Sequence, residues 1–317
     1  MILLLGASGY FGRAFAGELR RRGHSFIPLT RRAFDYTRFD FLFDYMRTIK
    51  PVFLVNAASY SGQPHDTGCE REREQAMSAN ALLPQMIARV CLMTKTPWGH
   101  VSSGCIYNGG KITEDGRERI EKDLGGPEIR RLFAAHPERF RGFNEMDEAN
   151  FSFRHPPCSF YSGTKALAEE AIREIGQCYI WRLRLPFNER DEPCNLLCQQ
   201  PEVMDDAINS LSHLEDCVRA CLDLWEIRAP FGIYNVTNPG AVAVREIVQG
   251  MTRATQAQRA EQPHSPKART PRSNCILDVS KLLQSGVKIR PVTEAMEESL
   301  AGLRATLRAG KPNGFNN

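Results

Sequence analysis

A chain of 317 residues is long enough for one large α/β domain or two smaller ones with a buried core. Hydrophobic residues make up 42% and charged residues 25%, with 24 glycines and 19 prolines, which excludes disordered, collagen-like and coiled-coil chains. The formal net charge of +4 is small and dispersed, so we expect no nucleic-acid partner.

The ten cysteines are scattered, and neither a Cys-x-x-Cys nor a His-x-x-x-His spacing occurs, so we expect no structural metal site. The apolar residues 1–5 run straight into glycine and predict a buried strand rather than a signal peptide. The chain has no uninterrupted apolar stretch of about 18 residues, which argues against a membrane partner. Together these features favour a cytoplasmic protein with reduced thiols.

Predicted strands and helices alternate from the first residue to about residue 185. The expected order is strand 2–5, a glycine-rich turn at 6–9, helix 10–22, strand 25–29, a helix ending near 49–50, strand 52–55, a helical stretch at 70–91, strand 100–103, helix 161–175 and strand 179–183. Such alternation predicts a parallel sheet covered by helices on both faces, a Rossmann-type doubly wound α/β fold. Residues 109–142 are rich in arginine, glutamate and lysine without a regular period, so we expect a solvated surface insertion there.

Beyond residue 185 the predicted elements are shorter and are separated by proline and glycine. We expect a helix at 214–224, a strand at 232–236, a helix at 244–252 and a polar, proline-rich loop at 256–273. The sequence therefore predicts a large domain at 1–185 and a smaller C-terminal lobe at 186–317 that is partly interleaved with it.

A glycine-rich turn joins the first predicted strand to the first predicted helix. Its residues are Gly6, Ala7, Ser8, Gly9, Tyr10, Phe11 and Gly12. Glycines at this spacing let the backbone turn tightly and approach a pyrophosphate, while the N-terminus of the helix supplies N–H donors. The alternative is that the glycines only allow close packing, but the strand, turn and helix context favours a dinucleotide-binding site.

The second predicted strand runs into Thr30, Arg31 and Arg32, about where a fold specific for NAD carries an acidic residue for the ribose hydroxyls. A guanidinium suits the additional 2′-phosphate of NADP, so we expect NADP as the cofactor, with NAD left open. The alternative is an exposed pair of arginines that binds no ligand.

Tyr161 and Lys165 are four residues apart at the start of a predicted helix, and Ser103 ends a predicted strand. The spacing places the phenol and the ammonium on one helix face, where the ammonium favours loss of the phenol proton to a carbonyl group. Ser103 is expected to donate a hydrogen bond to the same carbonyl oxygen, whereas Ser102 should point to the opposite face. By itself a Tyr-x-x-x-Lys pair is more often structural, but the dinucleotide-binding turn favours a catalytic pair.

These motifs, in this order, resemble those of the extended short-chain dehydrogenase/reductases, and within them the nucleotide-sugar reductases. The sequence is similar to the bifunctional UDP-4-keto-6-deoxyglucose 3,5-epimerase/4-reductases of UDP-rhamnose synthesis and, more distantly, to the dTDP-4-dehydrorhamnose reductases. The resemblance spans residues 1–285 except the charged insertion. Matching residues include Asn56-Ala57-Ala58, Ser61-Gly62-Gln63-Pro64, Cys69-Glu70, Asn80, Gly104-Cys105-Ile106-Tyr107, Phe143-Asn144-Glu145, Ser159-Phe160-Tyr161-Ser162 and Pro271-Arg272-Ser273-Asn274.

The resemblance implies an NADP-dependent oxidoreductase that passes a hydride to C4 of a nucleotide-linked 4-keto-6-deoxy sugar. In this view Tyr161 is the proton donor, Lys165 assists it and Ser103 polarises the ketone. The larger domain would bind NAD(P) and the smaller lobe the nucleotide sugar, in a chain that could form a homodimer. Beyond the glycine turn, the implied cofactor-binding residues are Asn56, Ala57, Ala58, Asn80, Tyr161 and Lys165. The implied substrate-binding residues are Ser61, Gln63, His65, Cys105, Asn188, Asn195 and Arg272.

In the bifunctional relatives a cysteine and a downstream lysine serve the 3,5-epimerisation. Cys105 matches the cysteine, but Gln199 occupies the lysine position, and a neutral amide does not carry a proton. This departure predicts that epimerisation is lost or confined to one carbon, with Cys105 and His65 as the remaining candidates. The alternative for Cys105 is a small packing residue.

Two other functions stay open. A non-catalytic nucleotide-binding regulatory subunit of the same fold would not need Ser103, Tyr161 and Lys165 together, so their joint presence favours an enzyme. Among enzymes, a nucleotide-sugar epimerase is the alternative. A dehydratase would carry an Asp-Glu pair after the strand-end serine, where Gly104 and Cys105 stand instead.

Overall fold

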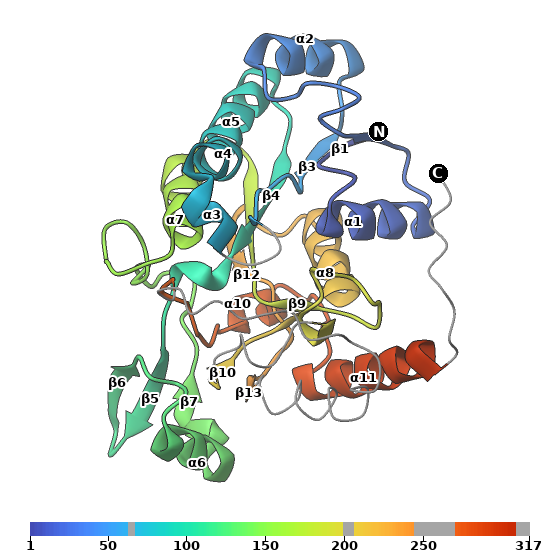
Figure 1. Ribbon diagram of the computed structural model, residues 1–317. Helices are drawn as coiled ribbons and strands as arrows, with labels where there is room; N and C mark the ends of the chain where they lie inside the picture. The colour runs from blue at the N-terminus through green and yellow to red at the C-terminus, as the bar shows by residue number, and fades with distance from the viewer. Residues whose placement is uncertain (63–66, 199–205, 244–269, 309–317) are drawn as a thin grey trace.

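The computed structural model describes residues 1–62, 67–198, 206–243 and 270–308. Its centre is a six-stranded sheet in the order β12-β8-β4-β3-β1-β2, in which every adjacent pair is parallel (Figure 1). The strands are β1 (Ile2–Leu5), β2 (Phe26–Leu29), β3 (Phe53–Asn56), β4 (Trp98–Ser103), β8 (Cys178–Leu183) and β12 (Gly232–Asn235). This sheet confirms the predicted doubly wound α/β fold.

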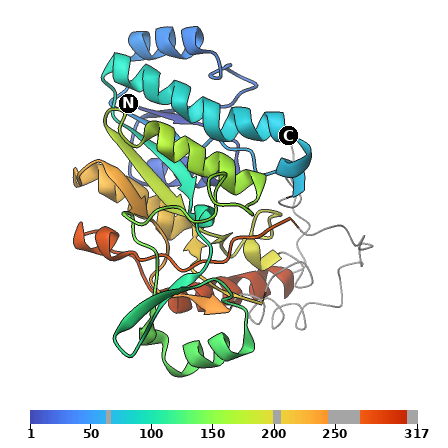
Figure 2. The same cartoon turned by 90° about the vertical axis from the view of Figure 1, so that its left-hand side faces the viewer.

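Helices cover both faces of the sheet because each strand alternates apolar side chains between the faces. Ile2 and Leu4 of β1 contribute to one core, and Leu3 and Leu5 to the other. The first core packs under α1 (Tyr10–Arg21) and α8 (Leu214–Glu226), and the second under α2 (Phe39–Ile49), α5 (Leu83–Thr94) and α7 (Phe160–Ile172). Figure 2 shows α5 and α7, in teal and yellow-green, side by side across the second face.

The direction of strand order reverses between β1 and β3, and ligands bind at such a switch point in open α/β sheets. Gly6 follows β1 in a left-handed conformation with φ +75°, and a Cβ there would lie 2.6 Å from the backbone nitrogen of Ala58. A Cβ on Gly12 would lie 2.0 Å from the carbonyl oxygen of Gly6. Only glycine therefore lets the turn fit between α1 and the end of β3.

One continuous helical run, Arg73–Thr94, is long and apolar enough to cross a membrane. It consists of α4 (Arg73–Met77), the π-helix η1 (Ser78–Leu82) and α5, and it follows the short α3 (Thr67–Arg71). Half of its apolar window is buried, and Ile87, Val90 and Cys91 pack in the core beneath the sheet. Packing against the sheet therefore accounts for the apolar composition of this helix.

The chain after residue 185 contributes to two parts of the molecule. β12 forms one edge of the main sheet, and α8 covers one of its faces. The C-terminal part of the chain is therefore interleaved with the larger domain. A separate core forms the smaller lobe, where α11 (Val292–Arg308) packs on Phe187, Leu197 and Leu211. The lobe also contains β9 (Pro186–Phe187), η4 (Leu196–Cys198), β10 (Ile208–Asn209), β11 (Ser212–His213) and β13 (Val242–Ala243), whereas α10 (Ser280–Gln284) packs on β12 of the main sheet. The helix expected at 244–252 and most of the loop expected at 256–273 lie outside the described residues.

Residues 109–142, expected to be a solvated surface insertion, are folded into regular strands and helices that the sequence pattern did not predict. The elements are β5 (Gly110–Glu114), β6 (Arg117–Glu121), α6 (Pro127–Ala135), η3 (Pro137–Arg139) and β7 (Phe140–Arg141). The three strands pair antiparallel, and the unit lies below the main sheet (Figure 2). β6 is almost wholly exposed and mostly charged, so its sequence lacks the alternation of apolar and polar residues by which strands are identified. Leu124 anchors the unit to Ile208 and Ile276 of the smaller lobe.

His213 stands immediately before α8 in a cluster of carboxylates. Its side chain is 6% exposed, its Nδ1 lies 3.2 Å from Asp216 Oδ2, and its Nε2 lies 3.8 Å from carboxylate oxygens of Glu189 and Glu215. Burial lowers the pKa of His213, but the hydrogen bonds to Asp216 and Glu189 outweigh it and raise the pKa to about 9. The charged imidazole therefore stabilises the folded chain.

We expect the charged imidazole of His213 to contribute its full stabilisation of the folded state below about pH 6.5, the ordinary pKa of histidine. This stabilisation should be lost as the pH rises through about 9, the pKa of His213 in the folded chain. The difference in free energy of unfolding between wild type and His213→Asn should shrink by about 3 kcal/mol across that range. Urea unfolding at pH 6 and at pH 9.5 measures it. A difference that does not change with pH would contradict the pairing.

Candidate active site

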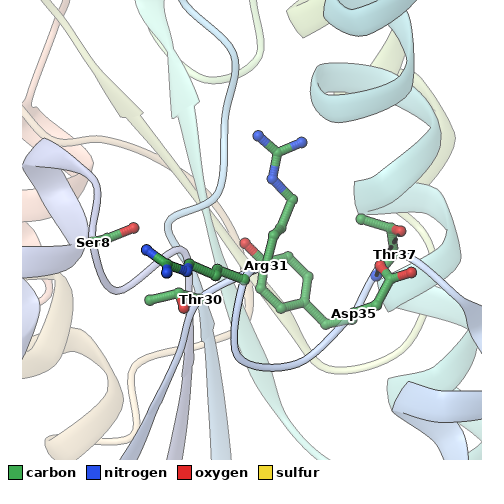
Figure 3. A pocket seen from close by; sticks show the side chains of 7 residues that line it. Ser8, Thr30, Arg31, Asp35 and Thr37 are labelled. Atoms are coloured by element: carbon green, nitrogen blue, oxygen red, sulfur yellow. Dashed lines mark hydrogen bonds between the residues drawn. The ribbon is translucent and has the colours of Figure 1, made fainter.

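The carboxyl ends of β1 and β2 open into a cavity of about 680 Å³ (Figure 3). Its lining residues are Ser8, Thr30, Arg31, Arg32, Asp35, Tyr36 and Thr37. Figure 3 shows Ser8, on the turn after β1, across the cavity from Asp35 and Thr37. The structure thus brings the glycine-rich turn and the two arginines, predicted separately from the sequence, to one cavity.

The turn leaves backbone N–H groups available at the start of α1. Gly9 is the N-cap, and within the described residues no side chain caps this helix. Ser8 and Gly9 are exposed, whereas Tyr10 and Phe11 pack their rings against the core. Uncapped N–H groups at a helix N-terminus bind anions, so the turn fits a pyrophosphate held by backbone donors.

Three residues of the cavity were not predicted. Tyr36 is 2% exposed, and burial raises its pKa. The backbone N–H and the hydroxyl of Thr37 both donate to Asp35 Oδ1, which shapes the loop that closes the cavity. The sequence signal for Asp35, Tyr36 and Thr37 is their position a few residues after the second strand. They form no motif that would have identified them.

Asn56, Ala57 and Ala58 follow β3 at the switch point. Asn56 is fully buried; its Oδ1 accepts from the N–H of Ala58 at 3.1 Å, and its Nδ2 lies 3.0 Å from Nδ1 of His100. Burial holds the pKa of His100 well below its ordinary value, so the imidazole is neutral and its Nδ1 accepts from the amide. These bonds fix the backbone of residues 56–58 against the turn at Gly6.

Tyr161 lies in the first turn of α7, whose start is held by two acceptors. Ser159 Oγ accepts from the N–H of Ser162 at 3.0 Å, and Glu70 Oε1 accepts from the N–H of Phe160 at 2.6 Å. Such caps satisfy N–H groups that the helix itself leaves open. They fix the backbone on both sides of Tyr161.

Lys165 lies one turn further along α7 and is 1% exposed. Its Nζ donates to the carbonyl oxygen of Val101 at 3.1 Å and lies 6.0 Å from the centre of the Tyr161 ring. Burial lowers the pKa of Lys165 to about 8. The ammonium is therefore charged below about pH 8, on the same side of the helix as the phenol.

Ser103 ends β4 and is the N-cap of the short helix η2 (Gly104–Ile106). Its Oγ accepts from the N–H of Cys105 at 3.2 Å, which leaves the hydroxyl proton to donate. Ser102 faces the other way and donates to Glu169 Oε1. Because α7 packs against both β4 and η2, Ser103 lies at the same end of the sheet as the start of that helix.

Asn80 occupies the π-helical turn η1 and is fully buried. Its Oδ1 accepts from Ser59 Oγ at 3.0 Å and from the N–H of Tyr60 at 2.8 Å, and its Nδ2 donates to the carbonyl oxygen of Tyr60 and to Thr164 Oγ1. Asn80 therefore ties residues 59–60 to α7, the helix that carries Tyr161 and Lys165. A contact with the cofactor stays a prediction.

Cys105 is half-buried, and its Sγ accepts a hydrogen bond from Arg184 Nη1 at 2.8 Å. Arg184 follows β8 directly and is 3% exposed. We did not predict Arg184 as a site residue. Its position at the carboxyl end of a predicted strand, like that of Ser103, was the sequence signal that could have identified it.

The remaining predicted substrate residues differ in their surroundings. Ser61 is exposed and Arg272 half-buried. Asn188 and Asn195 are fully buried and bond to each other, with Asn195 Nδ2 donating to the Asn188 carbonyl oxygen at 2.7 Å. In the structure these two residues support the 188–195 loop, and direct contact with a substrate stays a prediction. Gln63, His65 and Gln199 lie outside the described residues.

A buried ion pair lies behind the site. Arg182 and Glu169 are separated by 2.7 Å, and each side chain is 5% exposed. Arg182 Nη1 also donates to the Tyr107 hydroxyl at 2.9 Å. Glu169 is one helical turn from Lys165, so the ion pair connects α7 to β8 and, through Tyr107, to the segment that leads into the 109–142 unit.

Comparisons with known proteins show what the sequence and the fold of this chain are similar to. Residues 1–128 match the family described as RmlD substrate binding domain. The chain is 29% identical over 208 residues to a trifunctional UDP-glucose 4,6-dehydratase/UDP-4-keto-6-deoxy-D-glucose 3,5-epimerase/UDP-4-keto-L-rhamnose-reductase of Arabidopsis thaliana, covering 64% of this chain but 27% of that relative. It is 26% identical over 260 residues to the bifunctional dTDP-4-dehydrorhamnose 3,5-epimerase/dTDP-4-dehydrorhamnose reductase of the same organism, covering 79% of this chain and 77% of the relative.

Solved structures share the fold over nearly the whole chain. The UDP-rhamnose synthase of Acanthamoeba polyphaga mimivirus superimposes with a TM-score of 0.73 at 17% identity, covering 95% of this chain and 98% of that one. The dTDP-4-dehydrorhamnose reductase of Bacillus anthracis in complex with NADP gives a TM-score of 0.67 at 17% identity, covering 96% and 97%. In sequence motifs and in fold, the chain therefore resembles the extended short-chain dehydrogenase/reductases of rhamnose-type nucleotide-sugar synthesis.

Proposed function

We propose that this chain reduces the C4 ketone of a nucleotide-activated 4-keto-6-deoxyhexose with NADPH. One observation carries the proposal: Ser103 and the Tyr161–Lys165 pair lie at the end of the sheet where the glycine-rich turn follows β1. The similarity to relatives named as rhamnose reductases supports the class of sugar. UDP and dTDP both occur among the nucleotides of these relatives, and the choice between them is left to experiment.

The residues of the cavity fit NADP. The glycines allow no Cβ where the turn approaches α1 and β3, and the exposed Arg31 and Arg32 border the same cavity. The turn would hold the pyrophosphate and the arginines the 2′-phosphate. When bound, the reduced nicotinamide supplies the hydride.

The chain's own residues would handle the proton and the ketone. Tyr161 gives its phenol proton to the C4 oxygen, and the buried ammonium of Lys165 stabilises the phenolate left behind. Ser103 donates its hydroxyl proton in a hydrogen bond to the same oxygen while its Oγ is held by the N–H of Cys105. The result is a C4 alcohol and a phenolate that solvent reprotonates.

The direct test is incubation of the purified chain with UDP- or dTDP-4-keto-6-deoxyglucose and NADPH. We expect loss of NADPH absorbance with one or both nucleotides, and a deoxyhexose with a C4 hydroxyl in the NMR spectrum. The Tyr161→Phe variant is the control for background reduction. No oxidation of NADPH by wild type with either sugar, supplied as such or already epimerised, would overturn the proposal.

We expect wild type to prefer NADPH over NADH, and the double variant Arg31→Ala/Arg32→Ala to lose that preference. One charge-assisted hydrogen bond contributes about 1.5–3 kcal/mol, which is roughly a ten- to hundredfold difference in affinity. The measurement is kcat/KM with each cofactor. Arg38→Ala is the matched control because Arg38 lies in the same loop but pairs with Asp40 outside the cavity. A preference for NADH, or one that survives the double change, would contradict the assignment.

We also propose a homodimer in a reducing, cytoplasmic compartment. The ten cysteines are scattered along the chain rather than spaced as a disulfide framework, and this pattern supports a reducing compartment. Light scattering of the purified chain tests the assembly, and a monomeric mass at micromolar concentration would contradict it.

A further inference from the structure

Arg13, the residue after the last glycine of the glycine-rich turn, joins that turn to the smaller lobe. Its Nη1 donates to the carbonyl oxygen of Ser8 at 2.8 Å, and its Nη2 donates to the carboxylate of Glu192. Ser8 borders the cavity beside β1 and β2, whereas Glu192 lies in the 188–195 loop. Because a guanidinium is planar and rigid, it fixes the positions of its two acceptors relative to each other.

The loop that carries Glu192 is held together by one buried amide. The N–H of Asn195 donates to the carbonyl oxygen of Glu192 at 2.9 Å. The Nδ2 of Asn195 donates to the carbonyl oxygens of Asn188 and Arg190 at 2.7 and 2.6 Å. Its Oδ1 accepts from the N–H of Leu197 at 3.1 Å, and Leu197 packs in the core of the smaller lobe. A movement of Glu192 is therefore passed to the whole loop and to that core.

Tyr10 makes a second approach from the turn to the same loop. Burial raises the pKa of Tyr10, and the nearby carboxylates of Glu215 and Glu192 raise it further. Glu215, on α8, is itself paired with Arg190 of the loop at 2.9 Å. The start of α1 therefore faces the 188–195 loop with two side chains, and the loop is also attached to α8.

A dinucleotide on the turn would restrict this link. The N–H groups of the turn are the expected donors to a pyrophosphate, and the carbonyl oxygen held by Arg13 belongs to the same short stretch of backbone. Peptide groups are planar, so fixing the N–H groups of the turn also restricts its carbonyl oxygens. A nucleotide sugar in the smaller lobe would restrict the 188–195 loop. Two ligands that order the same group each lower the entropy cost of binding the other.

We propose that Arg13 is a positioning residue that couples NADPH binding at the glycine-rich turn to nucleotide-sugar binding in the smaller lobe, through its bond to Glu192. This inference rests on the proposed function. Each ligand binds more tightly when the other is present, and by the same factor. The side chains of Arg13 and Glu192 are 49% and 23% exposed, so solvent screens the pair and the factor is small, about two- to fivefold.

The first experiment needs NADPH but no sugar. Hydrogen–deuterium exchange of peptides that cover residues 188–195 is followed by mass spectrometry with and without saturating NADPH. The chains compared are wild type, Arg13→Met, Glu192→Gln and the double variant. We expect NADPH to slow exchange in this loop by about two- to fivefold in wild type and to leave it unchanged in all three variants.

Arg21→Met is the matched control. Arg21 lies on the same helix, but its side chain donates to Glu18 within α1, at 2.6 and 2.7 Å. The substitution removes a cation of the same kind and leaves the link between the turn and the loop in place. NADPH should therefore slow exchange in the 188–195 loop as it does in wild type.

The second experiment measures the coupling between the two ligands. Calorimetry gives the Kd of UDP-glucose and of dTDP-glucose, which carry no C4 ketone and so are not reduced, alone and with saturating NADPH. We expect NADPH to tighten their binding about two- to fivefold in wild type and Arg21→Met, but not in Arg13→Met or Glu192→Gln. The double variant should match the single variants, because the two substitutions remove one link.

Equal protection of the loop by NADPH in wild type and Arg13→Met would overturn the coupling. So would an Arg13→Met chain that binds NADPH more than about tenfold more weakly while Glu192→Gln behaves as wild type, since Arg13 would then be a ligand of the pyrophosphate. If neither sugar nucleotide binds, the proposed function fails, yet the exchange profiles still decide whether Arg13 connects the turn to the loop. The two failures are therefore distinguishable.

Discussion

Replacing Tyr161 by phenylalanine should lower kcat for reduction by roughly 10²–10⁴-fold, the usual contribution of a general acid. The substitution removes one hydroxyl group and keeps the ring in the first turn of α7, so Ser159 and Glu70 still cap the helix. Cofactor binding should change little, because the glycine-rich turn and the cavity beside β2 are untouched. NADPH absorbance measures kcat, and fluorescence titration measures the Kd for NADPH.

Tyr45→Phe is the matched control. Tyr45 lies in α2 and packs its ring 4.7 Å from that of Phe34, away from Ser103 and Lys165. We expect its kcat to equal that of wild type. A Tyr161→Phe enzyme with wild-type turnover would show that another group donates the proton.

Arg182→Met should lower the free energy of unfolding by about 3–5 kcal/mol, because it leaves a buried carboxylate without its cation. Among the described residues, Glu169 would keep only the hydroxyl of Ser102 as a hydrogen-bond donor, in a place where its side chain is 5% exposed. The double variant Glu169→Leu/Arg182→Met should recover much of the loss, because it removes both charges and keeps apolar volume. Urea unfolding at pH 7 measures all three chains.

The neighbouring residue on the same helix offers the control for this prediction. Glu170 pairs with Arg154 at 2.8 Å, but the arginine side chain is 71% exposed. Solvent screens that pair, so Arg154→Met should lower the free energy of unfolding by less than about 1 kcal/mol. Equal losses in Arg154→Met and Arg182→Met would contradict the argument from burial.

Local chemistry in the sequence was enough to predict the strands and helices of the main sheet. The run of apolar residues at 2–5 predicted β1, and Gly23, which adopts φ +71° just after α1, correctly marked the helix end. Each of these signals acts over one or two helical turns, so it survives without knowledge of the fold. The 109–142 unit shows the opposite case, because an exposed strand such as β6 carries no apolar alternation and depends on its pairing with β5.

The same division applies to the site. Tyr161 and Lys165 lie on one helix, and Ser103 and Ser102 alternate along one strand, so spacing alone predicted their geometry. Arg184 and Cys105 are 79 residues apart, and only the parallel pairing of β4 with β8 brings their ends together. Tyr36 likewise lines the cavity with Ser8 only because the pairing of β1 with β2 brings their carboxyl ends together. The sequence by itself therefore determined the helices and strands, and the motifs whose residues lie within one of them. The tertiary structure decided every contact between strand ends, because residues distant in the sequence meet only after the sheet is assembled.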